Sequence, residues 1–184
     1  MIDYDDRTHT YRDGAEILPS VTTVLSSYFG IDERFYKPGA AERGRDVHSL
    51  CAEYAAGLAV KPAPELRGYV DAFKQWIFDS GARFLEIEQI IEGEIDGRRY
   101  AGRYDLLVNL GGKVTLVDIK TGARCVWHVA QVAAYALRAR PRPAQGMVLY
   151  LTARGEYREN FHPPRELLQG IETFKAALAA WSEK

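Results

Sequence analysis

The sequence predicts a single α+β domain, a mixed α/β sandwich of helices around one central mixed sheet. Three apolar runs, at residues 84–95, 98–109 and 113–120, are separated only by short turn sequences, which is typical of a three-strand meander. Before and after the meander, apolar residues recur every three or four positions, and this spacing indicates amphipathic helices that flank the sheet. At 184 residues, the chain is long enough for one domain, residues 1–184, with a substantial core.

Residues 1–18 are expected to form an N-terminal hairpin. Polar side chains alternate through Thr8 and Thr10, Asp13-Gly14 is a strong two-residue turn signal, and residues 17–18 form the returning strand. Ser20 then caps a short predicted helix, because its hydroxyl oxygen can accept a hydrogen bond from a backbone N–H of the first helical turn.

Residues 20–80 are expected to be helical, and residues 82–184 are expected to contain the core sheet and its helices. In the first region, apolar residues at helical spacing predict helices over about 39–56 and 65–79. The elements expected after the meander are a helix over 125–138, strands over 147–152 and 157–161, and a final helix from Pro163-Pro164 to about Trp181.

Composition favours an ordinary globular protein of the cytoplasm. Hydrophobic residues make up 47% of the chain and charged residues 27%. No apolar run reaches the roughly 18–20 residues of a membrane-spanning helix, so no membrane partner is expected. The acidic start, residues 1–6, lacks the apolar segment of a signal peptide. Cys51 and Cys125 are too few for a disulfide framework or a four-cysteine site.

Basic residues form local clusters although the formal net charge is only −1. The near-neutral charge by itself disfavours nucleic acid as a partner, because many nucleic-acid-binding proteins carry a basic excess. The clusters are either solvated surfaces or parts of a locally positive groove that neutralises phosphates. They comprise Arg43 and Arg45 beside His48; Arg98, Arg99 and Arg103 before Asp105; Lys120 and Arg124 after it; and Arg138, Arg140 and Arg142.

The residues most informative about chemistry lie on two neighbouring strands of the meander. Asp105 lies on the second strand, and Asp118 and Lys120 end the third. Because side chains alternate along a strand, Lys120 points the same way as Asp118, while Ile119 points into the core and leaves its carbonyl available. Two carboxylates from adjacent strands can hold a divalent metal ion, which promotes phosphodiester hydrolysis. Lys120 can then orient the attacking water or stabilise the transition state.

A simpler interpretation of these residues is a structural ion pair. An Asp-x-Lys triplet is common, so Asp118 and Lys120 can pair at the edge of the sheet, with Asp105 in a turn. However, residues 114–119 are almost wholly apolar, and a charged pair at the end of a buried strand is costly unless it has a role. With Asp105 on the preceding strand, a metal site is the favoured interpretation.

Two further motifs lie on predicted helices. His48 follows Arg43 and Arg45 on the helix over 39–56, where a lone histidine is often structural or exposed. Gln131 and Tyr135 are four residues apart and therefore share one face of the helix over 125–138. That pair is equally typical of a surface glutamine beside a half-buried tyrosine.

Together and in this order, these residues resemble the RecB-like branch of the PD-(D/E)XK nuclease superfamily. Within that branch, the chain is most similar to the mitochondrial genome maintenance exonucleases and to phage-type exonucleases. The resemblance also includes residues 18–22, residues 146–150 and the closing helix, and thus nearly the whole chain. The matching motifs are Gly44-Arg-Asp-Val-His48, Glu88, Gly102-Arg-Tyr-Asp105, Asp118-Ile-Lys-Thr-Gly122 and Gln131-x-x-x-Tyr135.

The resemblance implies a restriction-endonuclease-like core and a role for each catalytic motif. Asp105, Asp118 and the Ile119 carbonyl would bind a Mg²⁺ or Mn²⁺ ion. His48 would be a further ligand, and it would fit Mn²⁺ better than Mg²⁺ because imidazole is the softer donor. Lys120 would be the catalytic lysine.

The other implied roles concern DNA and the order of the metal site. Gln131 and Tyr135 would contact or position the strand near the scissile phosphate. Glu88 would help to order the metal site, although Glu86 and Glu92 compete for this role. An iron–sulfur cluster, which some relatives bind through four cysteines, is not expected in a chain with two.

DNA is the expected partner, with recombination or replication proteins of a bacterial or phage host as further partners. Arg43, Arg45, Arg103 and Arg124 are the candidate basic contacts to DNA. Aromatic residues can stack on bases or pack in the core, and core packing is favoured for each of Tyr28, Phe29, Phe35, Tyr36 and Trp127.

The expected function is that of a metal-dependent deoxyribonuclease, an exonuclease acting on single strands or DNA ends in replication, recombination or repair. Helices near residues 20–56 are expected to arch over the site and admit only a threaded strand. A structure-selective or restriction-like endonuclease is the alternative among enzymes. A catalytically silent nucleic-acid-binding domain is the alternative outside them. No helicase or ATP-binding motif is present in the sequence.

Overall fold

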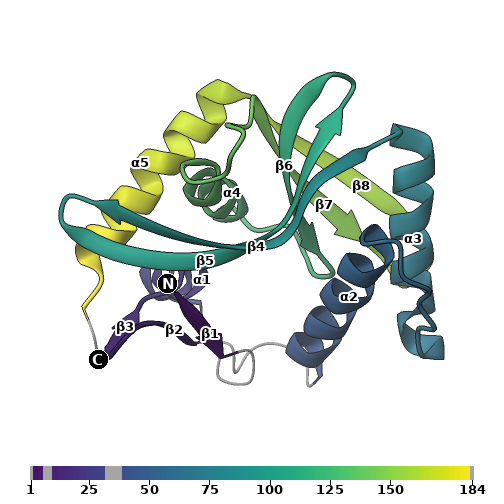
Figure 1. Ribbon diagram of the computed structural model, residues 1–184, viewed down its shortest axis with the longest axis horizontal. Helices are drawn as coiled ribbons and strands as arrows, with labels where there is room; N and C mark the ends of the chain where they lie inside the picture. The colour runs from purple at the N-terminus through teal and green to yellow at the C-terminus, as the bar shows by residue number, and fades with distance from the viewer. Residues whose placement is uncertain (1, 6–9, 32–38, 183–184) are drawn as a thin grey trace.

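A five-stranded mixed sheet forms the centre of the computed structural model, which describes residues 2–5, 10–31 and 39–182 (Figure 1). The strands lie in the order β4-β5-β6-β7-β8, and β6 and β7 are parallel while the other neighbours are antiparallel. This arrangement confirms the predicted α+β fold with a mixed sheet and a meander. The strands are β4 (Arg83–Ile95), β5 (Arg98–Leu110), β6 (Lys113–Lys120), β7 (Gln145–Leu151) and β8 (Tyr157–His162).

The meander forms where the turn chemistry predicts it. Asp96 and Gly97 join β4 to β5 with φ of 51° and 74°, and a turn with two positive φ values matches the right-handed twist of antiparallel strands. Gly111 and Gly112 join β5 to β6 in the same way, with φ of 56° and 85°. These two turns account for the local part of the sheet, which is the part that the sequence predicts most directly.

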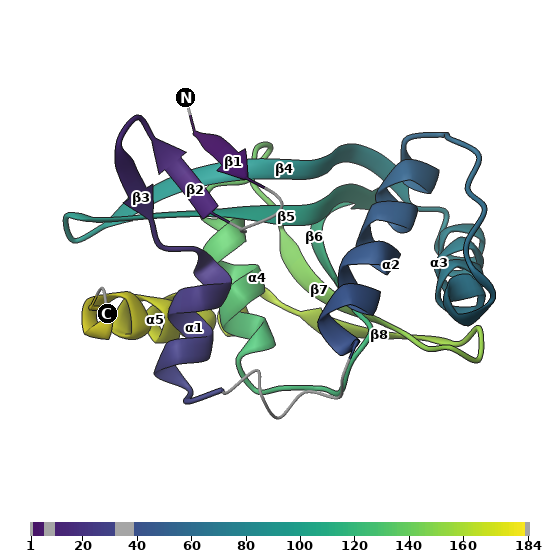
Figure 2. The same ribbon diagram turned by 90° about the horizontal axis from the view of Figure 1, so that it is seen from below.

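Five helices cover the two faces of the sheet among the described residues (Figures 1 and 2). One core cluster joins α1, α4 and α5 to one face, and a second cluster joins α2 and α3 to the other. Alternation along β6 supplies both clusters, since Leu116 belongs to the first and Val117 and Ile119 to the second. No helix in the described ranges combines the length and apolar character of a membrane crossing. The helices are α1 (Val21–Tyr28), α2 (Ala40–Ala55), α3 (Pro64–Ser80), α4 (His128–Ala136) and α5 (Pro164–Ala180).

The N-terminal hairpin is larger than predicted, because a third strand joins it. Strands β2 (Thr10–Asp13) and β3 (Glu16–Leu18) form the expected hairpin, and β1 (Asp3–Asp5) pairs with β2 so that Tyr4 lies opposite Tyr11. Thr8, part of the predicted alternation, lies outside the described residues. A run as short as β1 carries no periodicity of its own, which explains why the sequence pattern does not reveal it.

The N-terminus of α1 is fixed against β5. The Ser20 hydroxyl accepts a hydrogen bond from the Thr23 N–H at 3.0 Å, which confirms the predicted cap. Ser20 also forms an isolated parallel bridge with Ala101, and the Ala101 N–H donates to the Pro19 carbonyl at 3.0 Å. These contacts fix the start of α1 beside the middle of β5.

Helix α4 is shorter than predicted at both ends. It begins at His128 rather than residue 125 and ends at Ala136 rather than residue 138. The His128 N–H donates to the Cys125 carbonyl at 3.3 Å, and the Arg138 N–H donates to the Tyr135 carbonyl at 3.0 Å. Both are tight three-residue turns, which apolar periodicity cannot distinguish from a full helical turn.

Candidate active site

The candidate active site lies where β5 and β6 separate. Their pairing ends at Leu106 and Val117, while β5 continues beyond β6 paired only with β4. Asp105 and Asp118 are the next residue on each strand beyond that last pair, and both are buried. The Ile119 N–H donates to Asp105 Oδ2 at 2.6 Å, so this carboxylate takes the place of a main-chain acceptor.

The Ile119 carbonyl faces the same gap. In a strand, the N–H and C=O of one residue point to the same side, and the Ile119 N–H points toward Asp105. Its side chain is packed in the core between the sheet and helices α2 and α3. The backbone N–H of Ile119 is therefore directed at Asp105 while its side chain is buried in the core, as the alternation predicts.

Beyond their last pair, β5 and β6 diverge like a fork. Lys120 lies beside Asp118 in this fork. Lys120 Nζ is 2.6 Å from Asp118 Oδ2, and the lysine side chain is 19% exposed against 3% for the aspartate side chain. On its other side, β6 pairs with β7, so that Lys120 lies next to Tyr150. The ion pair of the simpler interpretation thus exists, but it lies beside Asp105 rather than alone at the edge of the sheet.

Helix α2 and strand β4 complete an acidic cluster around Asp105. His48 Nδ1 lies 3.0 Å from Asp105 Oδ1. Ligand atoms of His48, Glu88 and Asp105 all lie within 4.8 Å of one another, which is close enough for one ion to contact all three. This set of carboxylate oxygens and one imidazole nitrogen suits a divalent cation such as Mn²⁺.

Glu88 reaches the cluster through an unusual backbone conformation. Its φ is 52°, in the left-handed region that L-residues rarely adopt, and it lies on β4 between the Ile87–Leu106 and Gln89–Tyr104 pairs. Such strain persists where the surrounding structure enforces it, often at functional sites. The two competing glutamates point elsewhere, since Glu86 accepts from the Tyr104 hydroxyl and Glu92 pairs with Arg99.

The pKa values of the two aspartates shift in opposite directions because the two carboxylates share the available cations unequally. Burial tends to raise the pKa of Asp105, but His48, Lys120 and the Ile119 N–H outweigh it and leave that pKa below its ordinary value. Burial raises the pKa of Asp118, and Asp105 adds to the effect despite Lys120. Burial opposes protonation of His48, but Asp105 outweighs it and raises the pKa of the imidazole. A cation bound among these groups would favour the charged form of both carboxylates.

Gln131 and Tyr135 of α4 lie on the same cleft. Gln131 Nε2 donates to the Tyr135 hydroxyl at 3.2 Å and to Thr22 Oγ1 at 3.3 Å. Gln131 Oε1 is buried and has no hydrogen-bond partner within the described ranges. The glutamine is therefore held by α1 and α4 and still has one polar atom without a protein partner.

Tyr135 depends on the absence of a side chain at Gly102. A Cβ atom at Gly102 would lie 2.6 Å from Tyr135 Cε1 and 3.3 Å from Val21 Cγ2, so the tyrosine ring packs directly on the β5 backbone. Gly102-Arg-Tyr-Asp105 therefore combines a contact surface for Tyr135 with the carboxylate of Asp105.

Replacing Gly102 with alanine is expected to displace Tyr135 and lower the free energy of unfolding by about 1–3 kcal/mol, as overpacking typically does. Urea unfolding measures the loss. Gly122→Ala is the matched control, because a Cβ there meets nothing within 4 Å and its φ is not positive. Equal stability of the two variants would contradict the packing argument.

One cleft of about 790 Å³ contains these groups. Arg45 and Arg103 line it, whereas Arg43 and Arg124 do not, and the Arg43 guanidinium lies over the Tyr69 ring, 5.9 Å from its centroid. Helical geometry accounts for the difference between Arg43 and Arg45. Residues two apart on a helix are rotated by about 200° around its axis and so point to nearly opposite sides. Residues that line the cleft but were not predicted include Tyr4, Tyr11, Ser20, Thr22, Thr23 and Ser49.

The aromatic candidates divide into different environments. Trp127 is buried and lines the cleft. Tyr28 and Phe29 are 48% and 37% exposed, so the favoured core packing is wrong for both. They end α1, where the helix extends past its contacts with the core. Phe35 and Tyr36 lie outside the described residues.

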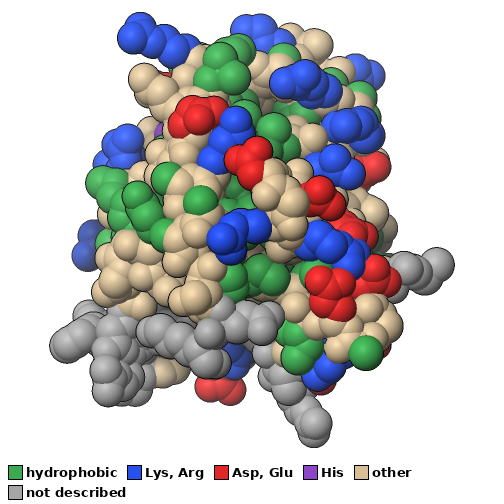
Figure 3. Space-filling model, turned by 90° about the vertical axis from the view of Figure 1, so that its left-hand side faces the viewer, with side chains coloured by type: hydrophobic (Ala, Val, Ile, Leu, Met, Phe, Trp, Pro, Cys, Tyr) green, Lys and Arg blue, Asp and Glu red, His purple; other side chains and the backbone are tan. Residues whose placement is uncertain are grey.

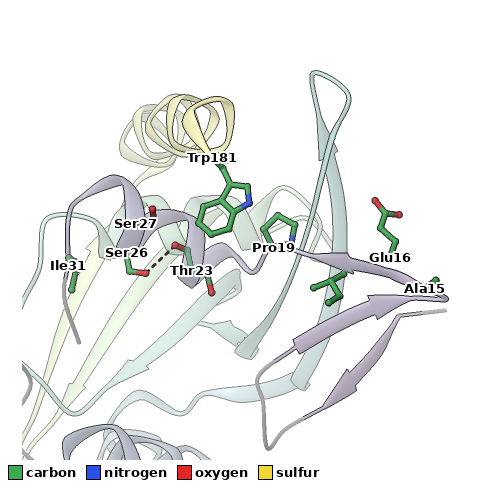
Figure 4. A pocket seen from close by; sticks show the side chains of 9 residues that line it. Ala15, Glu16, Pro19, Thr23, Ser26, Ser27, Ile31 and Trp181 are labelled. Carbon is green, nitrogen blue, oxygen red and sulfur yellow. Dashed lines mark hydrogen bonds between the residues drawn. The ribbon is translucent and has the colours of Figure 1, made fainter. Parts of the chain in front are cut away.

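A second cavity, of about 780 Å³, lies between the β2–β3 turn, α1 and Trp181 (Figure 4). Pro19, Thr23 and Trp181 line it, and Ser26 Oγ donates to the Thr23 carbonyl at 3.1 Å. Glu16 is the one ionisable side chain in the described lining of this second cavity, so the cavity lacks the clustered carboxylates and lysine of the cleft.

On the face shown in Figure 3, basic and acidic side chains are interspersed rather than separated into one basic patch.

His128 is buried behind Lys120. Its Nδ1 lies 2.8 Å from the Tyr150 hydroxyl, and burial, helped by the nearby charge of Lys120, lowers the pKa of His128 to about 3. In the unfolded chain, a histidine takes up a proton near pH 6.5. Between about pH 6.5 and 3 the unfolded state therefore binds more protons than the folded state, and stability falls as the pH falls.

The variant His128→Phe is expected to be less sensitive to acid. Over pH 6 to 4.5, its free energy of unfolding should fall less steeply than that of the parent, by up to about 1.4 kcal/mol per pH unit. Urea unfolding at several pH values measures both slopes, and all other titrating groups are common to the two proteins. Parallel curves would show that His128 is not held neutral.

A model of the PD-(D/E)XK nuclease superfamily matches residues 31–184. No curated protein matches the chain in sequence. Among solved structures, the chain is similar to SSO0001, with a TM-score of 0.46 and 17% identity over 94% of this chain and 81% of that one. A candidate exonuclease from Eubacterium rectale has a TM-score of 0.49 and 12% identity, over 87% and 72%. LHK-Exo in complex with dAMP has a TM-score of 0.41 and 15% identity, over 88% and 86%.

Proposed function

The chain belongs to the PD-(D/E)XK nuclease superfamily, and on that basis we propose that it is a divalent-metal-dependent deoxyribonuclease that degrades single strands or DNA ends as an exonuclease. The observation that carries the proposal is the fork between β5 and β6. It brings Asp105, Asp118 and Lys120 together, and α2 adds His48 to the same cleft.

A divalent ion would be held by Asp105, Asp118, His48 and the Ile119 carbonyl, with Glu88 beside them. The cluster fits such an ion because it brings carboxylate oxygens and an imidazole nitrogen within reach of one cation. When bound, a divalent cation supplies electrophilic polarisation of the phosphoryl group and activation of water. Both Mg²⁺ and Mn²⁺ suit the carboxylates, and His48 favours Mn²⁺.

The side chains around the cluster would position the substrate and stabilise charge. Lys120 Nζ, held beside Asp118, would donate hydrogen bonds to the attacking water or to the phosphoryl oxygens as negative charge develops. Gln131 would help to position the strand near the scissile phosphate. Its Nε2 is already held by Thr22 and Tyr135, so its Oε1 would accept a hydrogen bond from the strand or from a bound water. Tyr135, packed on Gly102, would orient Gln131.

Within the superfamily, the proposal assigns the chain to the RecB-like branch. His48 on α2 and the Gln131–Tyr135 pair on α4 are the branch-specific motifs of the sequence, and all three residues line the cleft that contains Asp105. Recombination or replication proteins would be partners of such an exonuclease.

The proposal is tested by digesting 5′- and 3′-labelled DNA, as linear and circular, single- and double-stranded substrates, in Mg²⁺, Mn²⁺ and EDTA. Metal-dependent release of labelled ends from linear strands supports an exonuclease. Cutting of circular or internal sites indicates a structure-selective or restriction-like endonuclease instead. Binding without cleavage in every metal identifies a catalytically silent nucleic-acid-binding domain.

Threading would explain a preference for ends. Residues of α1 and α2 line the cleft, while residues 32–38 between these helices are outside the described ranges. If a DNA strand must thread between α1 and α2, a covalently closed single-stranded circle should resist digestion. The same strand should be degraded rapidly after it is made linear. Equal rates on the two substrates would exclude threading.

A further inference from the structure

The N-terminal sheet contributes to the cleft although it precedes the part of the chain that matches the nuclease family. That match begins at residue 31, yet Tyr4 and Tyr11 of the sheet line the active-site cleft with the catalytic residues. This wall lies outside the residues that the family model matches and lines the same cleft as Asp105, Asp118 and Lys120, so it is a natural place for substrate selection.

Arg103 connects this wall to the catalytic cluster. It lies on β5 two residues before Asp105, and its Nε is 2.7 Å from Glu88 Oε2. Its guanidinium also lies over the Tyr4 ring, with Cζ 4.8 Å from the ring centroid. The plane of the guanidinium is thus fixed by an ion pair and by an aromatic ring, and the side chain remains 31% exposed.

The ion pair with Glu88 decides between two uses of this arginine. A guanidinium already paired with a carboxylate is a weaker ligand for phosphate, because its charge is largely offset. Its flat surface remains suitable for stacking on a nucleobase, which does not require a free charge. Arg45, on the same cleft, has no ion pair with any described residue and is the better phosphate contact.

Tyr4 is held firmly enough to support such a stack. Its ring lies 4.7 Å from that of Tyr11 and is tilted by 31°, and the two residues are opposite each other on paired strands. Tyr11 is buried in a small core with Leu18 and Ala101, and Ala101 is two residues before Arg103 on β5. The stacked series of Tyr11, Tyr4 and Arg103 is therefore anchored to the strand that carries Asp105.

We propose that Arg103, held by Glu88 and Tyr4, stacks on an unpaired nucleobase next to the scissile phosphate and thereby selects a single strand. The inference rests on the proposed nuclease function and specifies its substrate. In a duplex, neighbouring base pairs cover both faces of each base, so the stack requires a base that is already unpaired or frayed at an end.

The test measures binding of a short single strand in which one abasic site is moved along the sequence. Fluorescence anisotropy gives the Kd for each position, in the Lys120→Ala background so that the strand stays intact. One position should weaken binding by about 5- to 100-fold, the range expected for loss of one stacked base. In Arg103→Lys, which keeps the charge but loses the plane, that dependence on position should disappear.

Matched variants separate stacking from charge and from folding. Arg165→Lys, an exposed change on α5 outside the cleft, should keep the abasic profile of the parent, which is the dependence of Kd on the position of the abasic site. Tyr4→Leu, a change on an edge strand that keeps apolar bulk, should flatten the profile as Arg103→Lys does. A uniform loss of affinity in Arg103→Lys for intact and abasic strands alike would mean a phosphate contact and would overturn the inference. An unchanged profile in both Arg103→Lys and Tyr4→Leu would overturn it as well.

The outcome is separable from that of the proposed function. If the chain cuts no DNA in Mg²⁺ or Mn²⁺ but shows the abasic profile, the nuclease proposal fails and the stacking site stands. If it cuts DNA while the profile is flat, the stacking site alone fails. If it binds no single strand at all, the stacking site is excluded, and the cleavage assays judge the nuclease proposal independently.

Discussion

Substitution of Lys120 with alanine is expected to lower the rate of DNA cleavage by on the order of 10²–10³-fold while DNA binding is largely retained. Lys120 Nζ lies 2.6 Å from Asp118 Oδ2, in the gap between β5 and β6. An ammonium group at that position would stabilise negative charge that grows as the phosphodiester is attacked, so its contribution would be larger in the transition state than in the bound complex. The loss should therefore appear in kcat more than in KM.

The matched control for this variant is Lys113→Ala at the other end of the same strand. Lys113 begins β6 and is exposed, so its removal changes the net charge equally without touching the cleft. Single-turnover cleavage and anisotropy in parallel separate chemistry from binding. Unchanged cleavage in Lys120→Ala would contradict the assigned role, and cleavage that also persists in EDTA would indicate a contaminating nuclease.

The local parts of the fold follow from the sequence, whereas the long-range parts do not. Asp96-Gly97 and Gly111-Gly112 specify two turns by their own conformational preferences, so β4, β5 and β6 are predictable as a meander. The parallel pairing of β6 with β7 depends on where α4 returns the chain, and no short pattern specifies it. The extra strand β1 likewise appears only through its pairing with β2.

The candidate site also combines local features that the sequence predicts with long-range features that it does not. Asp118 and Lys120 are recognisable because they end an otherwise apolar strand, and Ile119 follows from strand alternation. The fork that brings Asp105 to them depends on where the β5–β6 ladder stops, which is a property of sheet twist rather than of any motif. Tyr4 and Tyr11 were not predictable as cleft residues, because long-range contacts with β5, such as that between Pro19 and Ala101, bring them to the cleft.

Gln131 illustrates how a motif gains meaning from its tertiary surroundings. On α4 alone, Gln131 and Tyr135 are an ordinary i, i+4 pair. Contact with Thr22 of α1 and the missing side chain at Gly102 turn this pair into a fixed polar group in the cleft that contains the carboxylates. Small residues and hydroxyls from other elements thus determine whether the motif is structural or functional.

Substitution of Asp118 with asparagine is expected to stabilise the metal-free protein and to abolish its stabilisation by metal. Asp118 is 2% exposed, and burial together with Asp105 raises its pKa. A carboxyl whose pKa is raised by folding lowers the free energy of unfolding as the pH rises from its pKa in the unfolded chain through its pKa in the folded protein. This loss of stability persists at higher pH. Asparagine has the same shape without the charge, so in EDTA at pH 8 the variant should unfold at a higher urea concentration than the parent.

If Asp118 is a metal ligand, metal ions should reverse the order of stability, so that the parent becomes more stable than Asp118→Asn. At a Mn²⁺ concentration 100 times its Kd, the parent should gain about 2.7 kcal/mol in free energy of unfolding, because the ion binds only the folded state. Asp118→Asn should gain little, and its cleavage should fall by about 10³-fold or more, since several kcal/mol of electrostatic stabilisation depend on the ion. Asp71→Asn, an exposed change on α3, is the matched control. It should have the same free energy of unfolding as the parent in EDTA and in Mn²⁺. Equal stabilisation of Asp118→Asn and the parent by Mn²⁺ would remove Asp118 from the ligand set, because a lost carboxylate ligand must weaken binding of a hard cation.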